Sequence, residues 1–350
     1  MIFLKYLTLF GLLVSISACS TLGYYAQSAK GHLKLIQQQK PIAQWLSDPN
    51  VSPQRKKSLA LVQEIRQFAH QRLKLPNNAS YTQFAELHRK AVTWNLVVTP
   101  KYSISPAQWC FPLIGCISYK GYFSKARAFA EAAKFSALPY DIYVAPSTAY
   151  STLGWFSDPV VSPMLDQGII ITAETIFHEL AHQQVYHKSD SDFNEAFATA
   201  VGQAGTRLWL AEKHPENLAA YNQYLRKQGQ FIQLLLNTIT DLDKFYRSEH
   251  TAQQYAQGKQ QRIQKLKQNY QQLKQTWQGD SRYDSFFDKP INNARLVLTG
   301  IYYQYVPNFA KQLQQHKYDF SAFYQEMNQL KTASKQERKD YWLQQNRQVK

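Results

Sequence analysis

The stretch 168–205 constrains this chain more than any other, because it holds two short motifs with fixed spacing. These are His178-Glu179-Leu180-Ala181-His182 and, further on, Asn194-Glu195-Ala196-Phe197-Ala198. Histidines at i and i+4 share one face of a helix and lie close enough to bind one metal ion. The glutamate between them points toward the same ion without having to bind it, which suits a general base acting on metal-bound water. The first motif therefore predicts the metal helix of a zinc metallopeptidase.

The residues around this motif favour a helix packed against a core. The run 168–171 is apolar and β-branched, which predicts a short buried strand, and Thr172 is then a plausible N-cap for the helix. The apolar face of the helix comprises Ile176, Phe177, Leu180, Ala181 and Val185. The alternative is a half-buried helix that carries two histidines and no metal, but that alternative requires neither Glu179 nor the second motif.

A catalytic zinc site needs a third protein ligand besides the two histidines. The metzincin pattern places Gly and His three and six residues after the second histidine, and this chain has Val185 and Lys188 there. His187 is rotated off the ligand face, which predicts a surface residue. We expect the helix to run to about His187, a polar turn at 188–192 and a second helix from about residue 193.

Two antiparallel helices joined in this way bring Glu195 beside the last two turns of the metal helix. Glu195 is therefore the predicted third ligand. Asp190 and Asp192 remain rival ligands, and Asp192 with Glu195 also fits a capping box in which Asp192 is the N-cap.

The amino terminus resembles a bacterial lipoprotein signal. An apolar run leads to Ile16-Ser17-Ala18-Cys19, so residues 1–18 are predicted to be removed and Cys19 to be lipidated. By resemblance to lipoprotein sorting, Ser20 points to the outer membrane, with the protein facing the periplasm. The alternatives are an uncleaved anchor or an ordinary signal peptide.

The remaining cysteines, Cys110 and Cys116, flank a turn-like insert in a compartment where disulfides persist, which predicts a small disulfide loop. Metal binding by this pair is the alternative, but no His or Cys lies near it in the sequence.

The charge balance indicates the kind of partner. The chain has 350 residues, with 40 Lys and Arg against 24 Asp and Glu, and a formal net charge of +16. The positive charge is spread through Gln- and Lys-rich helical segments, which suits a solvated surface facing anionic envelope components. The expected partners are a peptide or protein substrate and the membrane, through the lipid on Cys19; no nucleic-acid-binding module matches, and no nucleic acid is expected.

The pattern of apolar residues predicts an α+β fold that is mostly helical, with a zincin-like core. After the signal we expect an N-terminal helical region at 19–90, which includes a short helix at 81–89. A mixed strand and helix core follows at 91–210, with a small strand-rich region before the HExxH helix. The C-terminal helical region at 211–350 includes a helical hairpin arm formed in part by the polar stretch 252–275.

Two further groups of residues are candidates for contact with a substrate. In the stretch 149–159, Gly154 would let an extended peptide approach a strand edge, and Tyr150, Trp155 and Phe156 could line a subsite. The alternative is a hairpin whose aromatic residues pack into the core. The candidate donors for the oxyanion of the transition state are Tyr302, Tyr303, Tyr305 and Arg295, which would otherwise be core aromatics and a surface arginine. Glu174 is a candidate anion for the free amine of an aminopeptidase substrate.

Several motifs together resemble a known family. The element from Phe193 to Thr199 after an HELAHQ run resembles the corresponding element of glutamate-ligand zincins, the thermolysin-like clan. Together with WCFP at 109–112, YKGYF at 119–123, AYSTLGWFSDP at 149–159 and NNARL at 292–296, the chain resembles the bacterial family called putative aminopeptidases. The resemblance implies one zinc ion bound by His178, His182 and Glu195, with Glu179 as the base. The sequence departs from thermolysin-like enzymes in having only twelve residues between His182 and Glu195.

The function expected from these features is zinc-dependent hydrolysis of peptide bonds in the cell envelope, by an aminopeptidase. The alternatives are an envelope endopeptidase, and a non-catalytic lipoprotein in which zinc staples two helices while the Gln-rich arm binds a partner.

Overall fold

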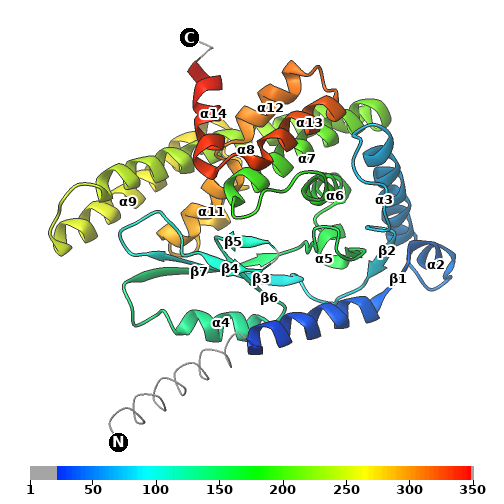
Figure 1. The fold of residues 1–350 in the computed structure, drawn as a ribbon, viewed down its shortest axis with the longest axis horizontal. Helices are drawn as coiled ribbons and strands as arrows, with labels where there is room; N and C mark the ends of the chain where they lie inside the picture. Colours follow the sequence, from blue (N-terminus) through cyan, green and yellow to red (C-terminus); the bar gives the residue numbers. More distant parts are fainter. Residues whose placement is uncertain (1–21, 113, 348–350) are drawn as a thin grey trace, which may run out of the picture.

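The computed structural model describes residues 22–112 and 114–347. The predicted signal and Cys19 lie outside the described residues. The protein is a mostly helical α+β structure with small sheets, as the sequence predicts (Figure 1).

The amino-terminal half mixes helices and strands. Its elements are a helix at 22–38, β1 (Gln39–Pro41), α2 (Ile42–Ser47), α3 (Pro53–Gln71), β2 (Gln83–Ala85), β3 (Thr93–Pro100), β4 (Trp109–Phe111), β5 (Gly115–Ile117), β6 (Lys120–Tyr122), α4 (Lys125–Ala133), β7 (Tyr140–Ser147) and β8 (Val160–Val161). The remainder is helical: α5 (Ser162–Leu165), α6 (Ile169–Gln184), α7 (Ser191–Lys213), α8 (Pro215–Tyr246), α9 (Ala252–Thr276), α10 (Asp284–Phe287), α11 (Asn293–Tyr303), α12 (Val306–Gln315), α13 (Phe320–Gln329), the 3-10 turn η1 (Leu330–Thr332) and α14 (Lys335–Arg347).

The larger sheet has the order β6-β3-β7, with antiparallel pairs, and helices cover both of its faces. Successive side chains of a strand point to opposite faces, and β3 follows this rule. Leu96 and Val98 pack with Ala128 of α4, whereas Val97 between them packs with Ala294 of α11. The sheet thereby fixes the position of α11 relative to the strands. A second small sheet, β1-β2-β8, joins the amino-terminal part to the chain just before α5.

The main core lies between α3, α6 and α7. Buried apolar residues of α6, among them Ile176 and Phe177, pack with residues of α7 such as Phe197 and Val201. The two helices approach closely at Gly202, where an added Cβ would lie 2.8 Å from the carbonyl oxygen of Glu174. A larger residue there would push α7 away from α6, so this glycine sets the spacing of the two helices.

Two local predictions are wrong. The isoleucines of 169–171 form the first turn of α6 and not a strand, with Gly168 as the N-cap residue, and the Thr172 hydroxyl donates within the helix to the carbonyl oxygen of Gly168. Differences in helix propensity are a fraction of a kcal/mol per residue, so packing of this turn on the core overrides them. The segment 81–89 is also not a helix, because β2 pairs there with β1 and β8.

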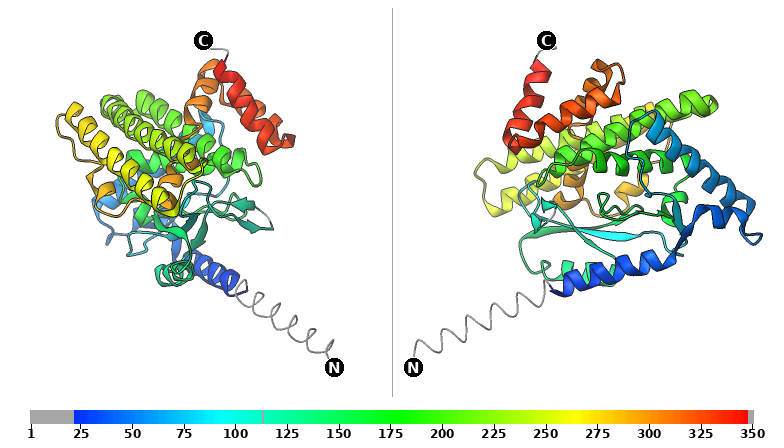
Figure 2. Two further views of the ribbon diagram at one scale, coloured as in Figure 1. Left: turned by 90° about the vertical axis from the view of Figure 1, so that its left-hand side faces the viewer. Right: turned by 45° about the vertical axis from the view of Figure 1, so that its right-hand side comes forward.

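Helices α8 and α9 form a long pair that extends from one side of the molecule (Figures 1 and 2). Their contact is apolar, with Phe231, Leu235 and Leu242 of α8 packed with Leu266 and Tyr270 of α9. Helices α12, α13 and α14 cover α7 on the opposite side from the larger sheet (Figure 1). Within the described ranges, no helix combines the length and the apolar character that a membrane span requires.

Strands β4 and β5 form a hairpin that is closed by a disulfide. Cys110 and Cys116 are directly opposite each other and are bonded, which confirms the predicted loop. The hairpin contacts the turn between α6 and α7, since the backbone N–H of Cys116 donates to Ser189 Oγ at 3.0 Å. Gly115 has a φ of +79°, and a Cβ there would lie 2.8 Å from the backbone nitrogen of Ser189, so only glycine suits this contact.

Candidate metal centre

The helix that carries the HExxH motif ends at Gln184, close to one turn earlier than predicted, and α7 begins at Ser191. The N-cap of α7 is Asp190 and not Asp192: the Asp190 side chain accepts from the backbone N–H of Phe193 at 3.4 Å. The connection is held by Asn194, which accepts from the N–H of His187 and donates to the carbonyl oxygen of His187, both at 2.8 Å. This pair of hydrogen bonds folds α7 back against α6.

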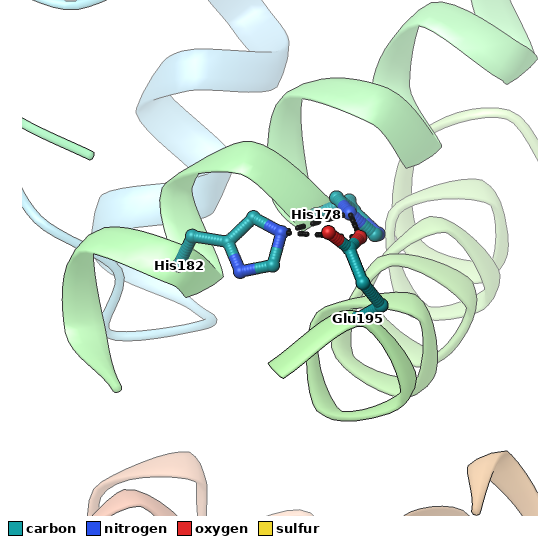
Figure 3. Close-up of side chains that lie close together, drawn as sticks. All are labelled: His178, His182 and Glu195. Atoms are coloured by element: carbon teal, nitrogen blue, oxygen red, sulfur yellow. Dashed lines mark hydrogen bonds and ion pairs between the residues drawn. The ribbon is translucent and has the colours of Figure 1, made fainter. Parts of the chain in front are cut away.

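The turn brings His178, His182 and Glu195 together (Figure 3). The Nε2 atoms of the two histidines are 3.1 Å apart, and Glu195 Oε2 lies 3.3 Å from that of His178 and 3.5 Å from that of His182. A tetrahedral ion with bonds of about 2.0–2.1 Å separates its ligand atoms by about 3.3–3.5 Å. The separations of the three side-chain atoms are thus close to those of a tetrahedral site, and the group could hold one metal ion.

The rival ligands are engaged elsewhere. Asp190 Oδ2 lies 2.7 Å from Arg338 Nε, and Asp192 Oδ2 lies 3.0 Å from Lys335 Nζ. Of the three carboxylates weighed from the sequence, only Glu195 joins the group with the histidines.

Burial makes the electrostatics of the group strong. His182 is 6% exposed and Glu195 is 7% exposed. Burial raises the pKa of Glu195, but the charges and hydrogen bonds of His182 and His178 outweigh it and hold that pKa well below its usual value. Burial lowers the pKa of His182, but Glu195 outweighs it and the net pKa is raised. The Glu195 carboxylate is thus ionised although it is buried, and it lies against both imidazoles.

The first histidine is oriented by α7. His178 Nδ1 lies 3.4 Å from Thr199 Oγ1, one turn after Glu195 on the same helix. If Nε2 of His178 bound a metal ion, Nδ1 would carry the proton and would donate to the threonine, which would fix the ring orientation. Two successive turns of α7 thus contribute to the centre: the first carries Glu195, and the second carries Thr199, which contacts His178 of α6.

Glu179 is partly buried beside the three ligands. Among the described residues it forms no hydrogen bond or ion pair, so its carboxylate remains available to a water molecule. Burial is the largest cause that raises the pKa values of Tyr81 and Tyr302, and the charge of Glu195 is the largest for Tyr119; the negative charge of Glu179 contributes to all three. Their hydroxyls therefore stay protonated at neutral pH.

Tyr302 is the one of the four predicted oxyanion donors that lies at the centre. Its ring stacks near that of His178, with centroids 6.3 Å apart, and its hydroxyl hydrogen-bonds with that of Tyr119. The Tyr119 hydroxyl donates to Glu195 Oε1 at 3.2 Å, and the charge of Glu195, followed by burial, raises the pKa of Tyr119 well above its usual value.

Tyr119 was not among the residues predicted to have a role. It reaches Glu195 from 76 positions away, through the folding of the segment just before β6, and local spacing carries no signal for such a contact. It lies within the YKGYF motif at 119–123, which supports the resemblance to the family but indicates no role for the tyrosine.

The other predicted donors lie elsewhere. Tyr303 is on the side of Glu174 and Tyr224, and Tyr305 is near Asp190 and Asp192, as the causes of their raised pKa values indicate after burial. Arg295 is 8% exposed and its guanidinium lies over the ring of Phe286, 4.2 Å from the centroid. It is therefore a buried arginine and not a surface residue.

The stretch 149–159 contains no strand and closes on itself as a loop around Asp158. That carboxylate accepts from the N–H and the hydroxyl of Thr152, at 2.9 and 2.8 Å. Tyr150 packs against the ring of Phe123 with centroids 4.8 Å apart, and a Cβ on Gly154 would touch Gln183 at 3.5 Å. Trp155 is 64% exposed and lines a pocket that also includes His182.

Glu174 lies one turn before His178 on α6. It accepts a hydrogen bond of 2.6 Å from the Tyr221 hydroxyl, and burial raises its pKa. Because side chains four positions apart share a helix face, Glu174, His178 and His182 follow one another along the same face of α6, with His178 in the middle.

His187 is 2% exposed, so the prediction of a surface residue is wrong. The early end of α6 turns it inward, where its Nε2 donates to the carbonyl oxygen of Met327 at 3.1 Å and its ring packs on Phe193. Burial, and then the charge of Arg338, lowers its pKa from 6.5 to about 4.

The free energy of unfolding is expected to depend on the charge state of His187. Between pH 6.5 and about 4 the unfolded chain binds a proton that the folded chain does not, so stability is full above pH 6.5 and falls below it, by up to about 3 kcal/mol. Denaturant unfolding of the wild type and of His187→Gln at pH 7.5 and pH 4.5 checks this. The wild type should lose more stability than the variant, whereas equal losses would contradict the assignment.

The fold and the centre together define a helical α+β protein with a two-histidine, one-glutamate group that could hold a metal ion. The chain belongs to the family described as putative aminopeptidase, whose model matches residues 23–342. No curated protein and no solved structure matches the chain.

Proposed function

We propose that this protein is a zinc-dependent peptidase of the cell envelope that removes residues from the amino terminus of peptides, with Glu179 as the general base. The observation that carries the proposal is the tetrahedral grouping of His178, His182 and Glu195, with an unpaired glutamate beside it. Two imidazoles, one carboxylate and one open position are the donor set of catalytic zinc sites in peptidases. Membership in the putative aminopeptidase family supports the reaction class.

Zinc held by these three residues would polarise the scissile carbonyl and lower the pKa of a water molecule toward about 7. Glu179 accepts a proton from the attacking water and later donates it to the leaving amine. The Tyr302 hydroxyl is protonated, and the ring of Tyr302 lies beside that of His178. Because the Tyr119 hydroxyl donates its single proton to Glu195, the Tyr302 hydroxyl donates to Tyr119, and it would turn from this bond to donate to the developing oxyanion. Such a contact is worth about 3 kcal/mol when it is formed only in the transition state. The Tyr119 hydroxyl donates to Oε1 of Glu195, which would keep the other carboxylate oxygen, Oε2, turned toward the ion.

Anchoring at the membrane through a lipid on Cys19 is part of the proposal. The first turn of the helix 22–38 lies next to the first turn of α4, where Arg127 donates to the carbonyl oxygen of Gly23 (Figure 1). These two elements and the residues just after α4 carry five large apolar side chains that are 41–70% exposed: Leu22, Tyr25, Leu33, Phe129 and Leu138. Exposed apolar side chains on these elements, near the amino-terminal end of the described chain, support its contact with lipid.

A direct test combines metal analysis with a digest of matched peptides. Purified protein is expected to hold about one zinc per chain and to release single amino acids from peptides with a free amino terminus. Acetylation of that terminus should slow cleavage at least tenfold, because a buried charged contact is lost. Equal rates would assign an endopeptidase, and bound zinc without any cleavage would assign a non-catalytic centre.

A further inference from the structure

A pocket of about 650 Å³ opens beside the metal centre, and His182 forms part of its wall. It continues past the carboxyl end of α6 to the segment that joins α13 to α14. Trp155 covers one side of it. Its volume lies within the range of small-ligand sites, and one end of it reaches a metal ligand. His182 belongs to both the grouped residues and the pocket lining, whereas His178, Glu179 and Glu195 do not line the pocket, so the pocket adjoins the centre on the side of His182.

The charged side chains that line the pocket are all positive. Its lining includes four cationic side chains, Lys188, Lys331, Lys335 and Arg338, and no aspartate or glutamate among the described residues. Two of these cations are neutralised by carboxylates outside the pocket lining, because Arg338 pairs with Asp190 and Lys335 pairs with Asp190 and Asp192. The other two form no ion pair within the described ranges, so Lys188 and Lys331 leave an uncompensated positive charge.

The two lysines come from separate parts of the chain. Lys188 follows the end of the metal helix in the turn that the β4-β5 hairpin supports, next to Ser189. Lys331 lies in η1, between α13 and α14, and lines the same pocket. The charges of Arg338 and Lys331 also lower the pKa of His187, after burial, which agrees with a positive potential here. Two cations from different elements thus line the same pocket without an acidic partner in the described ranges.

We infer that this pocket binds a carboxylate of the peptide substrate, so that the enzyme favours peptides with an anionic group close to the cleaved bond. The inference rests on the proposed peptidase function. The carboxylate has two possible sources, the side chain of an acidic residue and the free carboxyl terminus of a short peptide. Both are planar anions that a pair of lysine ammonium groups holds by charge-assisted hydrogen bonds.

Matched peptides separate the two sources. Each peptide starts with a free alanine, carries Glu or Gln at the second or third position, and ends in a carboxylate or an amide. For the wild type, kcat/KM is expected to be at least about tenfold higher for the peptide with a carboxylate in reach than for its neutral partner. The Glu–Gln pairs report on the side chain, and the carboxylate–amide pairs report on the carboxyl terminus.

The double variant Lys188→Gln/Lys331→Gln is expected to bring this ratio close to one and to leave cleavage of the neutral amidated peptides unchanged. Lys339→Gln removes an exposed lysine of α14 outside the pocket and should retain the ratio. A ratio near one in the wild type, or an unchanged ratio in the double variant, would overturn the inference.

A binding measurement keeps the inference testable if no peptide is cleaved. Glutarate, with its neutral diamide as the reference, is titrated into metal-free protein, so that the carboxylate has no metal to bind. Wild type should bind glutarate about tenfold more tightly than the double variant, and added salt should remove the difference. If the wild type cleaves no peptide but binds glutarate more tightly than the double variant, the proposed peptidase function is wrong and the carboxylate site stands. If the wild type cleaves peptides but binds glutarate no more tightly than the double variant, the carboxylate site is wrong and the peptidase function stands.

Discussion

Glu179→Gln is expected to lower kcat by at least about a hundredfold without changing the metal content. General acid–base catalysis contributes about 10²- to 10⁴-fold, and the amide of glutamine has the size of the carboxylate but accepts no proton. Because Glu179 forms no hydrogen bond or ion pair with another described residue, its replacement leaves the ligands and the core in place. The measurement is kcat on a free-amino peptide, with elemental analysis of the same sample.

A matched control changes a carboxylate away from the centre. Glu216 is on α8, its side chain is 67% exposed, and Glu216→Gln should retain the activity of the wild type. If Glu179→Gln binds zinc and cleaves peptides at the rate of the wild type, Glu179 is not the base. If neither the wild type nor the variant cleaves while both bind zinc, the ion serves to join α6 to α7.

The parts of the site that the sequence predicts are those fixed by local geometry. The i, i+4 spacing places His178 and His182 on one face whatever surrounds the helix, and a short connection leaves α7 little choice but to fold back on α6. The N-cap at Asp190 and not at Asp192 shifts the start of α7 by about two residues, which is within the uncertainty of helix ends and does not alter the face that carries Glu195.

Contacts made across the fold could not be predicted. Tyr119 reaches Glu195 because β6 pairs with β3. Helix α11 packs on the face of β3 where Tyr119 also packs, and it brings Tyr302 beside His178. Among 302, 303 and 305, only the docking of α11 on the sheet selects the residue that faces the ion, since neighbouring positions differ by about 100° around the helix. His187 is buried because α6 ends at Gln184, and the sequence pattern favoured a longer helix.

Loss of the metal is expected to lower the thermal stability of the protein, and Glu195 is the ligand through which this is best measured. An ion that binds only the folded state, at a free concentration a thousandfold above its Kd, adds about 4 kcal/mol to the free energy of unfolding. In a chain of this size, that corresponds to an increase in Tm of about 5–8 °C. Chelation of the wild type should reduce Tm by this amount, and one equivalent of zinc should restore it.

Glu195→Gln should abolish this dependence on zinc, because a neutral amide between His178 and His182 replaces the carboxylate that attracts the cation. Asp192→Asn is the matched control: it removes a carboxylate three positions earlier on the same helix, which pairs with Lys335, and it should keep the full response to zinc. A response that survives in Glu195→Gln and disappears in Asp192→Asn would transfer the third ligand to the aspartate. Since Asp192 is bound to the C-terminal helix in the structure, that result would also require α14 to move away from α7 when the metal binds.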